Sequence, residues 1–185
     1  IETLLQKVQQ APVDGLQKEI IVVDDGSTDD TALQLQRSPY PIRLVVHPKN
    51  LGKGAAVRRG FHAAPGDILL VQDADLEYDP NDYAALVEPI LRGEADAVMG
   101  SRFLSQKLRF LIRGGAPFFS HYIGNKAIIW LTNLLYGFRA TDYEGCYKAF
   151  TRRTIQETPL VSDGFELDNE LICKALRRGY RIAEV

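Results

Sequence analysis

Short apolar runs that alternate with helical patterns constrain the fold of this chain more than any other feature. The runs cover residues 19–23, 42–46, 67–71 and 95–99. Of the helical patterns between them, the first begins at Ser27, and the next two cover residues 54–64 and 80–92. This alternation predicts an α/β fold with a mostly parallel sheet and helices on both faces, because near-continuous apolar strands are then buried on both sides.

The length of 185 residues is that of one domain. No repeat and no Gly/Ser linker divides the chain, so residues 1–185 are interpreted as a single domain. The chain opens on an apolar helical stripe, and residues 180–185 have the pattern of a strand. We therefore expect further protein on both sides of this fragment.

Composition excludes several classes of protein. The net charge of −2 argues against a general nucleic-acid binder. The two cysteines, Cys146 and Cys173, are too few for a disulfide framework or a zinc ribbon. A cytoplasmic protein with reduced thiols is predicted.

Polar residues, acids among them, gather where the predicted strands end. Asp24 and Asp25 follow the first run, residues 47–53 follow the second, and residues 73–77 follow the third. In an open parallel sheet, ligands bind outside the carboxyl ends of the strands. The sequence therefore predicts a ligand site at this edge.

Three carboxylates alternate after the third run, at Asp73, Asp75 and Glu77. In extended backbone, alternating side chains share a face, so all three could point at one cation. Their oxygens suit Mg²⁺ or Mn²⁺. A solvated acidic loop before a helix capped by Asp79 explains the same residues equally well.

Two other protein classes use comparable acids. A haloacid-dehalogenase-type phosphatase needs Gly-Thr or a similar pair after its acidic motif, whereas Leu76 and Glu77 follow here. A receiver-like signalling module would use Asp24 and Asp25, but the Met-Pro turn usual after its acceptor aspartate is absent. The receiver remains an alternative.

Two polar turns suggest nucleotide contacts. Residues 24–29 offer carboxylates for ribose hydroxyls or a base edge, although a polar strand-to-helix turn has a similar composition. Residues 50–56, which include Lys53, are glycine-rich at a helix N-terminus, which favours anions. They match no Walker A loop, and a tight turn that packs helix on sheet is an equal alternative.

Residues 97–141 contain no Asp or Glu but several Arg and Lys residues among apolar ones. This composition is typical of a surface that lies on anionic lipid. Ordinary core packing is the alternative for the apolar residues Trp130, Leu131, Leu134 and Leu135.

Taken in order, residues 21–29, 50–54, 73–75 and 100–102 resemble the family 2 glycosyltransferases of GT-A fold. Residues 141–148 and Phe165-Glu166 resemble the polyprenyl-phosphate branch, typified by dolichol-phosphate mannosyltransferase and bacterial undecaprenyl-phosphate glycosyltransferases. The resemblance implies a Rossmann-like sheet whose first strand is missing from this chain.

The resemblance also implies roles for individual residues. The nucleotide-sugar set is Asp24, Asp25, Lys53, Asp73, Ala74, Asp75 and Arg102. The metal set, for Mg²⁺ or Mn²⁺, is Asp73, Asp75 and Glu77. The catalytic pair is Asp142 and Arg102, and the residues of the acceptor and membrane side are Arg109, Arg113 and His121.

The implied reaction is the inverting, metal-dependent transfer of a sugar from GDP-mannose or a UDP-hexose to dolichyl or undecaprenyl phosphate, at the cytoplasmic face of an anionic membrane. A phosphate acceptor is already anionic, so Asp142 would position it. A sugar or protein hydroxyl acceptor is the alternative, and it needs a general base from among Asp142, Glu166 and Asp168. The sequence leaves the base, the sugar, the lipid and the oligomeric state open.

Overall fold

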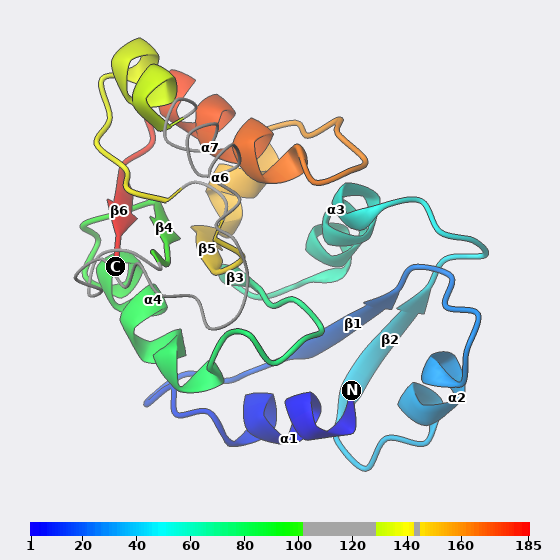
Figure 1. The fold of residues 1–185 in the computed structure, drawn as a ribbon. Coiled ribbons are helices and arrows are strands. Elements are labelled where there is room, and N and C mark those ends of the chain that lie inside the picture. Colours follow the sequence, from blue (N-terminus) through cyan, green and yellow to red (C-terminus); the bar gives the residue numbers. More distant parts are fainter. Residues whose placement is uncertain (102–128, 143–144) are drawn as a thin grey trace, which may run out of the picture.

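The computed structural model describes residues 1–101, 129–142 and 145–185 (Figure 1). Its helices are α1 (Glu2–Gln10), α2 (Thr31–Gln36), α3 (Lys53–Ala63), the 3₁₀ turn η1 (Pro80–Asp82), α4 (Tyr83–Leu91), α6 (Arg152–Glu157) and α7 (Leu167–Arg177). Residues 129–136 are also helical. The strands are β1 (Ile20–Asp24), β2 (Ile42–Val46), β3 (Ile68–Val71), β4 (Ala97–Met99), β5 (Lys148–Thr151) and β6 (Ile182–Glu184).

The strands form two sheets. β1 and β2 pair in parallel, whereas the second sheet has the order β3-β5-β4-β6. β4 and β6 are parallel, but β5 runs antiparallel to both of its neighbours. The prediction of an α/β fold with parallel pairing is confirmed, and β5 is the exception.

The direction of β5 has a topological cause. The chain leaves β4 at the carboxyl edge of the sheet and returns to the same edge, where the Gly100 N–H donates to the Tyr147 carbonyl over 2.8 Å. A strand that re-enters the sheet from this edge must run antiparallel to β4.

The predicted helix starts are correct in one place and displaced in another. Asp79 accepts a hydrogen bond from the Asn81 N–H at η1, as its predicted capping role requires. α2 begins at Thr31 rather than at Ser27, because the Ser27 N–H and hydroxyl both donate to Asp24. Ser27 therefore closes the turn after β1 instead of capping the helix.

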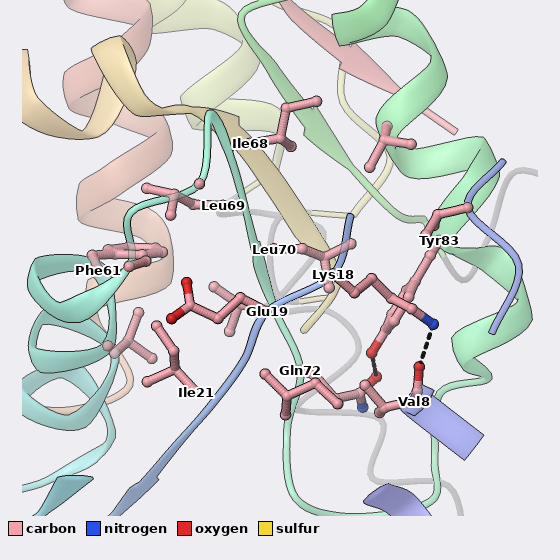
Figure 2. A pocket seen from close by; sticks show the side chains of 18 of the residues that line it. Val8, Lys18, Glu19, Ile21, Phe61, Ile68, Leu69, Leu70, Gln72 and Tyr83 are labelled. Atoms are coloured by element: carbon pink, nitrogen blue, oxygen red, sulfur yellow. Dashed lines mark hydrogen bonds between the residues drawn. The ribbon is translucent and has the colours of Figure 1, made fainter. Parts of the chain in front are cut away.

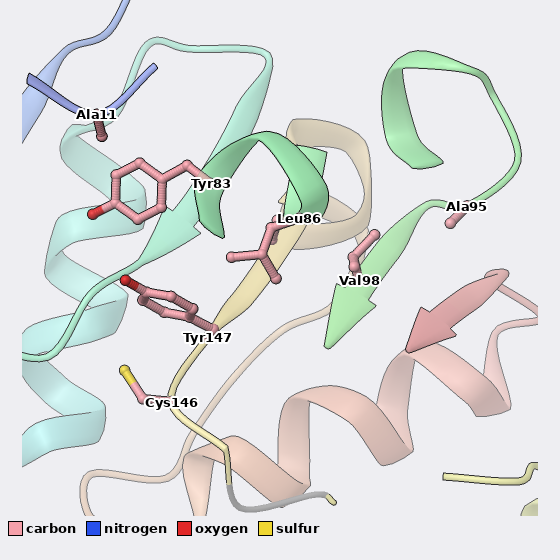
Figure 3. Close-up of a cluster of buried hydrophobic side chains, with 8 residues drawn as sticks. Ala11, Tyr83, Leu86, Ala95, Val98, Cys146 and Tyr147 are labelled. Carbon is pink, nitrogen blue, oxygen red and sulfur yellow. The ribbon is translucent and has the colours of Figure 1, made fainter. Parts of the chain in front are cut away.

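The core lies on both faces of β4 and β5. On one face, Val98 and Ala149 pack with Tyr83 and Leu86 of α4 (Figure 3). On the other face, Phe150 packs with Leu171 and Ile172 of α7, among others. Adjacent strand residues point to opposite faces, so α4 and α7 cover the sheet from opposite sides.

β1 and β3 run in the same direction but are not paired with each other. At their carboxyl ends, the Gly52 N–H binds Asp25 and the Lys53 ammonium binds Asp73, so both strands end beside the N-terminus of α3. A cavity of about 840 Å³ lies between them, lined by residues of both strands, of α1 and of α3. Figure 2 shows Ile21, Leu69 and Leu70 among the side chains that line it.

In the part of the chain that the structure describes, no helix is both long and apolar enough to cross a membrane.

Candidate functional site

The predicted ligand edge exists where β1, β2 and β3 end and α3 begins. It gathers Asp25, Lys53 and Asp73, which come from three separate segments of the sequence. The sequence placed these residues at one edge, and the structure brings them together. Their contacts define what each side chain is able to do.

Asp25 is engaged within the protein. Its carboxylate lies 2.6 Å from His47 Nδ1 and accepts hydrogen bonds from the backbone N–H groups of Leu51 and Gly52. Burial opposes ionisation, but these hydrogen bonds outweigh it and lower the pKa of Asp25. The carboxylate therefore joins the ends of β1 and β2 to the loop before α3, and its predicted contact with a base or ribose stays a prediction.

His47 is a residue whose role the sequence did not reveal. It is buried, with 9% of its surface exposed, and its ring is fixed against Asp25. The signal was its place directly after a predicted strand at the ligand edge. Asp24 is also buried, where it accepts from Ser27.

Glycines in both polar turns are required by close packing. Gly26 has φ +74°, and a Cβ there would lie 2.4 Å from the Lys49 carbonyl carbon. Gly52 has φ +101°, and a Cβ there would lie 2.4 Å from the Asp163 oxygen. The tight-turn interpretation of residues 50–56 therefore holds, and the predicted phosphate contact of this loop stays a prediction.

Lys53, the first residue of α3, carries its charge between two acids. Its ammonium donates to Asp73 Oδ2 over 2.9 Å and lies 3.5 Å from Asp168 Oδ2. Burial opposes the charged form, but the two carboxylates outweigh it, so the pKa of Lys53 is raised. The edge of β3 thus already accommodates a positive charge.

Asp168, near the start of α7, is shared by two lysines. Its second oxygen, Oδ1, accepts from the Lys148 ammonium over 2.9 Å. Lys148 is 1% exposed and also donates to the Gly145 carbonyl. From the sequence, Asp168 was predicted only as an alternative general base, and no role was predicted for Lys148. A lysine among the apolar residues at the start of β5 was the sign of a buried charge.

The backbone of Asp73 is fixed on both sides. Its N–H donates to Cys146 Sγ over 3.2 Å, and its carbonyl accepts from the Gln72 side-chain amide over 2.9 Å. Gln72 is itself held, because its oxygen accepts from the Tyr83 and Tyr147 hydroxyls. Burial, reinforced by the nearby carboxylate of Asp73, raises the pKa of Cys146 to about 12. Its buried, protonated thiol is a packing group at neutral pH.

The other predicted metal ligands lie apart from this network. Ala74, Asp75 and Glu77 are exposed, and Asp75 accepts from the Glu77 N–H over 3.1 Å. Within the described residues, no group of three or more His, Cys, Asp or Glu side chains is arranged to hold a metal ion. The carboxylate oxygens are nevertheless the donors that Mg²⁺ and Mn²⁺ prefer, and Asp73 already faces a cation. The donor types at this edge therefore suit such an ion, and the described side chains are not gathered around one point.

Asp142 is 1% exposed. Its N–H donates to Glu184 Oε1 over 2.9 Å, and Glu184 also accepts from the Thr141 N–H and hydroxyl. Glu184, on β6, thus fixes the backbone around Asp142. The sequence missed Glu184, because the pairing spans about forty residues and no local pattern marks it.

The remaining predicted site residues, Arg102, Arg109, Arg113 and His121, lie outside the described residues. The helical segment that follows them exposes Trp130, Leu131, Leu134 and Leu135, whereas Ile129 is buried. These four residues are called the exposed apolar face below. Core packing, the alternative for these side chains, does not hold.

Comparison with known proteins assigns the chain to a family. Residues 1–157 match the family described as Glycosyl transferase family 2. Dolichol-phosphate mannosyltransferase of Pyrococcus furiosus is 32% identical, over 94% of this chain and 49% of that protein. Glycosyltransferase AglD of Haloferax volcanii is 32% identical, over 90% of this chain and 26% of its own length. The chain thus spans half or less of these two relatives.

Solved structures agree in fold. The structure of glucosyl-3-phosphoglycerate synthase from Mycobacterium tuberculosis with Mn²⁺, UDP and glucosyl-3-phosphoglycerate has a TM-score of 0.72 and 27% identity. It is matched over 100% of this chain and 64% of its own. The structure of the same enzyme with phosphoglyceric acid has a TM-score of 0.73 and 26% identity, with the same coverage. These matches confirm the predicted GT-A fold and leave the receiver-like alternative without support. The chain therefore belongs to glycosyl transferase family 2.

Proposed function

We propose that this chain is the catalytic domain of an inverting glycosyltransferase that moves a sugar from a nucleotide sugar to a polyprenyl phosphate. Its similarity to a dolichol-phosphate mannosyltransferase supports the acceptor class. Its similarity to a synthase crystallised with Mn²⁺ and UDP supports a nucleotide donor and a divalent cation. The single observation that carries the proposal is the pairing of Lys53 with Asp73 at the carboxyl edge of the sheet.

On the donor side, Asp73 and Asp75 would hold Mg²⁺ or Mn²⁺, with Glu77 as a further oxygen ligand. The ion supplies positive charge that stabilises the departing diphosphate. Lys53 would supply a second positive charge to that diphosphate, because its ammonium already lies at this edge. Asp24 is the last residue of β1 and Asp25 follows it, at the place where the base and ribose would bind.

On the acceptor side, an anionic phosphate oxygen forms a bond to the anomeric carbon as the bond to the diphosphate breaks. The nucleoside diphosphate leaves with the electron pair, and no proton has to move. Asp142, held by Glu184, would position the acceptor. Arg102 would neutralise one of the two phosphate groups.

The hydroxyl-acceptor alternative needs a general base. Asp168 is poorly suited to that role, because one oxygen accepts from Lys148 and the other faces Lys53. The two lysine ammonium groups thus occupy both of its oxygens. Asp142 and Glu166 remain the candidate bases for a hydroxyl acceptor.

We also propose that the domain associates with an anionic membrane surface. The exposed apolar face supports this, because Trp and Leu side chains bury themselves in the headgroup region of a bilayer. The acid-free composition of residues 97–141 adds charge complementarity to anionic lipid.

For the domain as a whole, we propose that its sheet is completed by a further strand between β1 and β3. Protein interiors are close-packed, with few voids larger than a water molecule. A cavity of about 840 Å³ between two strand edges that run in the same direction fits an apolar strand parallel to both.

The function is tested by turnover of UDP- and GDP-sugars with a short-chain polyprenyl phosphate. We expect one nucleotide sugar to be used with inversion, and Asp73→Asn to abolish transfer. Asp67→Asn, at the opposite end of the same strand segment, is the matched control and should retain activity. Transfer to a sugar hydroxyl but not to polyprenyl phosphate would overturn the acceptor assignment.

Asp142→Asn separates the two acceptor classes. A phosphate acceptor needs no strong base, so we expect kcat to fall by less than about tenfold, since each 1.36 kcal/mol of lost transition-state stabilisation is tenfold in rate. A hydroxyl acceptor that uses Asp142 as its base would lose about 10²–10⁴-fold.

A further inference from the structure

The contacts around Lys53 form a network of alternating charges that reaches from the protein interior to the ligand edge. In order, it runs from Lys148 to Asp168, then to Lys53 and to Asp73. Three separate elements contribute to it, namely β5, α7 and α3, and Asp73 lies two residues after the end of β3. This charge network therefore couples the proposed cation ligand, Asp73, to the buried Lys148.

The buried end of this charge network is rigid. Lys148 is 1% exposed, and its ammonium is held by the Gly145 carbonyl as well as by Asp168. A buried charge of this kind is retained only where it is paired and hydrogen-bonded. Asp168 is accordingly a fixed negative charge beside the ligand edge.

At the outer end of the charge network, the Lys53 ammonium lies near two carboxylates. Lys53 lies 2.9 Å from Asp73 Oδ2 and 3.5 Å from Asp168 Oδ2, and its side chain is 20% exposed. Loss of the contact with Asp73 would leave Lys53 paired with Asp168. The ammonium also lies 5.7 Å from the centre of the Phe165 ring, whose face attracts cations.

We propose that Lys53 competes with a divalent cation for Asp73, and that Asp168, anchored by Lys148, retains Lys53 at the site when the cation takes Asp73. Besides its role toward the diphosphate, the charge of Lys53 then occupies the place of the ion until the ion binds. This inference rests on the proposed function, which places the ion at Asp73.

The proposal has a consequence for binding of the ion alone. Two positive charges next to Asp73 repel each other, so the protein should bind Mn²⁺ weakly without nucleotide. Removal of the lysine charge should strengthen that binding. A residue that only stabilised the fold would not produce this gain.

The test is a Mn²⁺ titration without nucleotide, in which the free ion is followed by its electron paramagnetic resonance signal. We expect Lys53→Met to lower the Kd for Mn²⁺ about tenfold or more, since one charge interaction of about 1.4 kcal/mol is a factor of ten. Lys49→Met removes the same charge from an exposed residue of the preceding loop and should leave the Kd unchanged. Asp73→Asn should abolish binding.

The role of Asp168 is tested in the same titration with the paired variant Lys148→Met/Asp168→Asn, which removes both buried charges together. Of its two carboxylate partners, Lys53 then keeps only Asp73. Mn²⁺ should therefore bind to this variant more weakly than to the wild type. Addition of Lys53→Met should restore binding. Circular dichroism and the Tm establish that each variant is folded.

The outcomes separate this inference from the proposed function. If the wild type binds Mn²⁺ through Asp73 but Lys53→Met has an unchanged or higher Kd, competition by Lys53 is wrong and the cation site stands. If neither the wild type nor Lys53→Met binds Mn²⁺, both the competition and the cation site are overturned, and the transfer assay separately decides whether the domain uses a nucleotide sugar.

Discussion

His47 Nδ1 lies 2.6 Å from Asp25 Oδ1, so one imidazole ties the end of β1 to the segment that follows β2. Asp25 also accepts from two backbone N–H groups before α3. A single carboxylate thereby fixes the relative placement of three segments of the ligand edge. Its removal should loosen the edge before it affects the distant core.

Asp25→Asn should lower the free energy of unfolding by about 1–3 kcal/mol. The Asn amide has one acceptor oxygen fewer than the largely buried carboxylate, so hydrogen-bond donors that now bind Asp25 lose their partner. Urea denaturation followed by circular dichroism measures the change. Asp30→Asn is the matched control, since the Asp30 side chain makes no capping hydrogen bond and should have little effect. Equal stabilities of the two variants would contradict a structural role for Asp25.

Glu170 predicts a specific acid sensitivity. Burial opposes its charge, but hydrogen bonds from Lys174, Ser162 and Val161 outweigh it and lower the pKa of Glu170 to about 2. A carboxyl whose folded pKa is depressed contributes stability above its unfolded pKa, and that stability is lost as the pH falls toward the folded pKa. The loss should therefore occur between about pH 4.5 and pH 2.

Glu170→Gln should flatten the stability profile in that pH window and lower stability at pH 7. Urea denaturation at a series of pH values measures both effects. Glu88→Gln, in an exposed pair with Arg92, is the control and should leave the profile unchanged. A wild-type profile that is level from pH 5 to pH 2 would contradict the assignment.

Lys148→Met should be among the most damaging single substitutions in the described core. Removal of one partner from a buried ion pair costs about 3–5 kcal/mol, because the other charge is left uncompensated. Lys148→Met/Asp168→Asn should recover part of the loss, since neither charge then remains. Thermal unfolding measures both, and Arg153→Met in an exposed pair should show no measurable change.

The exposed apolar face should bind membranes. Trp130→Glu combined with Leu134→Glu should reduce co-sedimentation with vesicles of anionic lipid by at least about tenfold, because buried apolar surface is lost and repulsive charge is added. Leu33→Glu, on the exposed side of α2, is the matched control and should bind as the wild type does. Unchanged binding by the double variant would exclude this face as the contact surface.

A strand between β1 and β3 should be visible by hydrogen exchange. In a longer form of the protein that supplies this strand, amides of Ile20–Asp24 and Ile68–Val71 should exchange more slowly than in residues 1–185. Amides of β4 are the internal control, because β4 already pairs with β5 and β6. Equal exchange in both forms would contradict a strand at this position.

Local sequence patterns predict the order and type of most elements. The residues of β2 match the apolar run at 42–46, and the strand at residues 68–71 differs from its predicted bounds by one residue. Both strands are largely apolar runs in the sequence, so their signal is local. The acids at the strand ends were equally visible, because they directly follow those runs.

The direction of β5 and the partners of the charged residues depend instead on long-range contacts in the folded protein. β5 is antiparallel because the chain returns to the edge it left, which no local pattern reveals. The pairs His47–Asp25, Lys148–Asp168 and Asp142–Glu184 join residues about 20 or more positions apart in the chain. Such contacts depend on which strand ends and helix starts meet in space, and hydrophobic periodicity does not encode that.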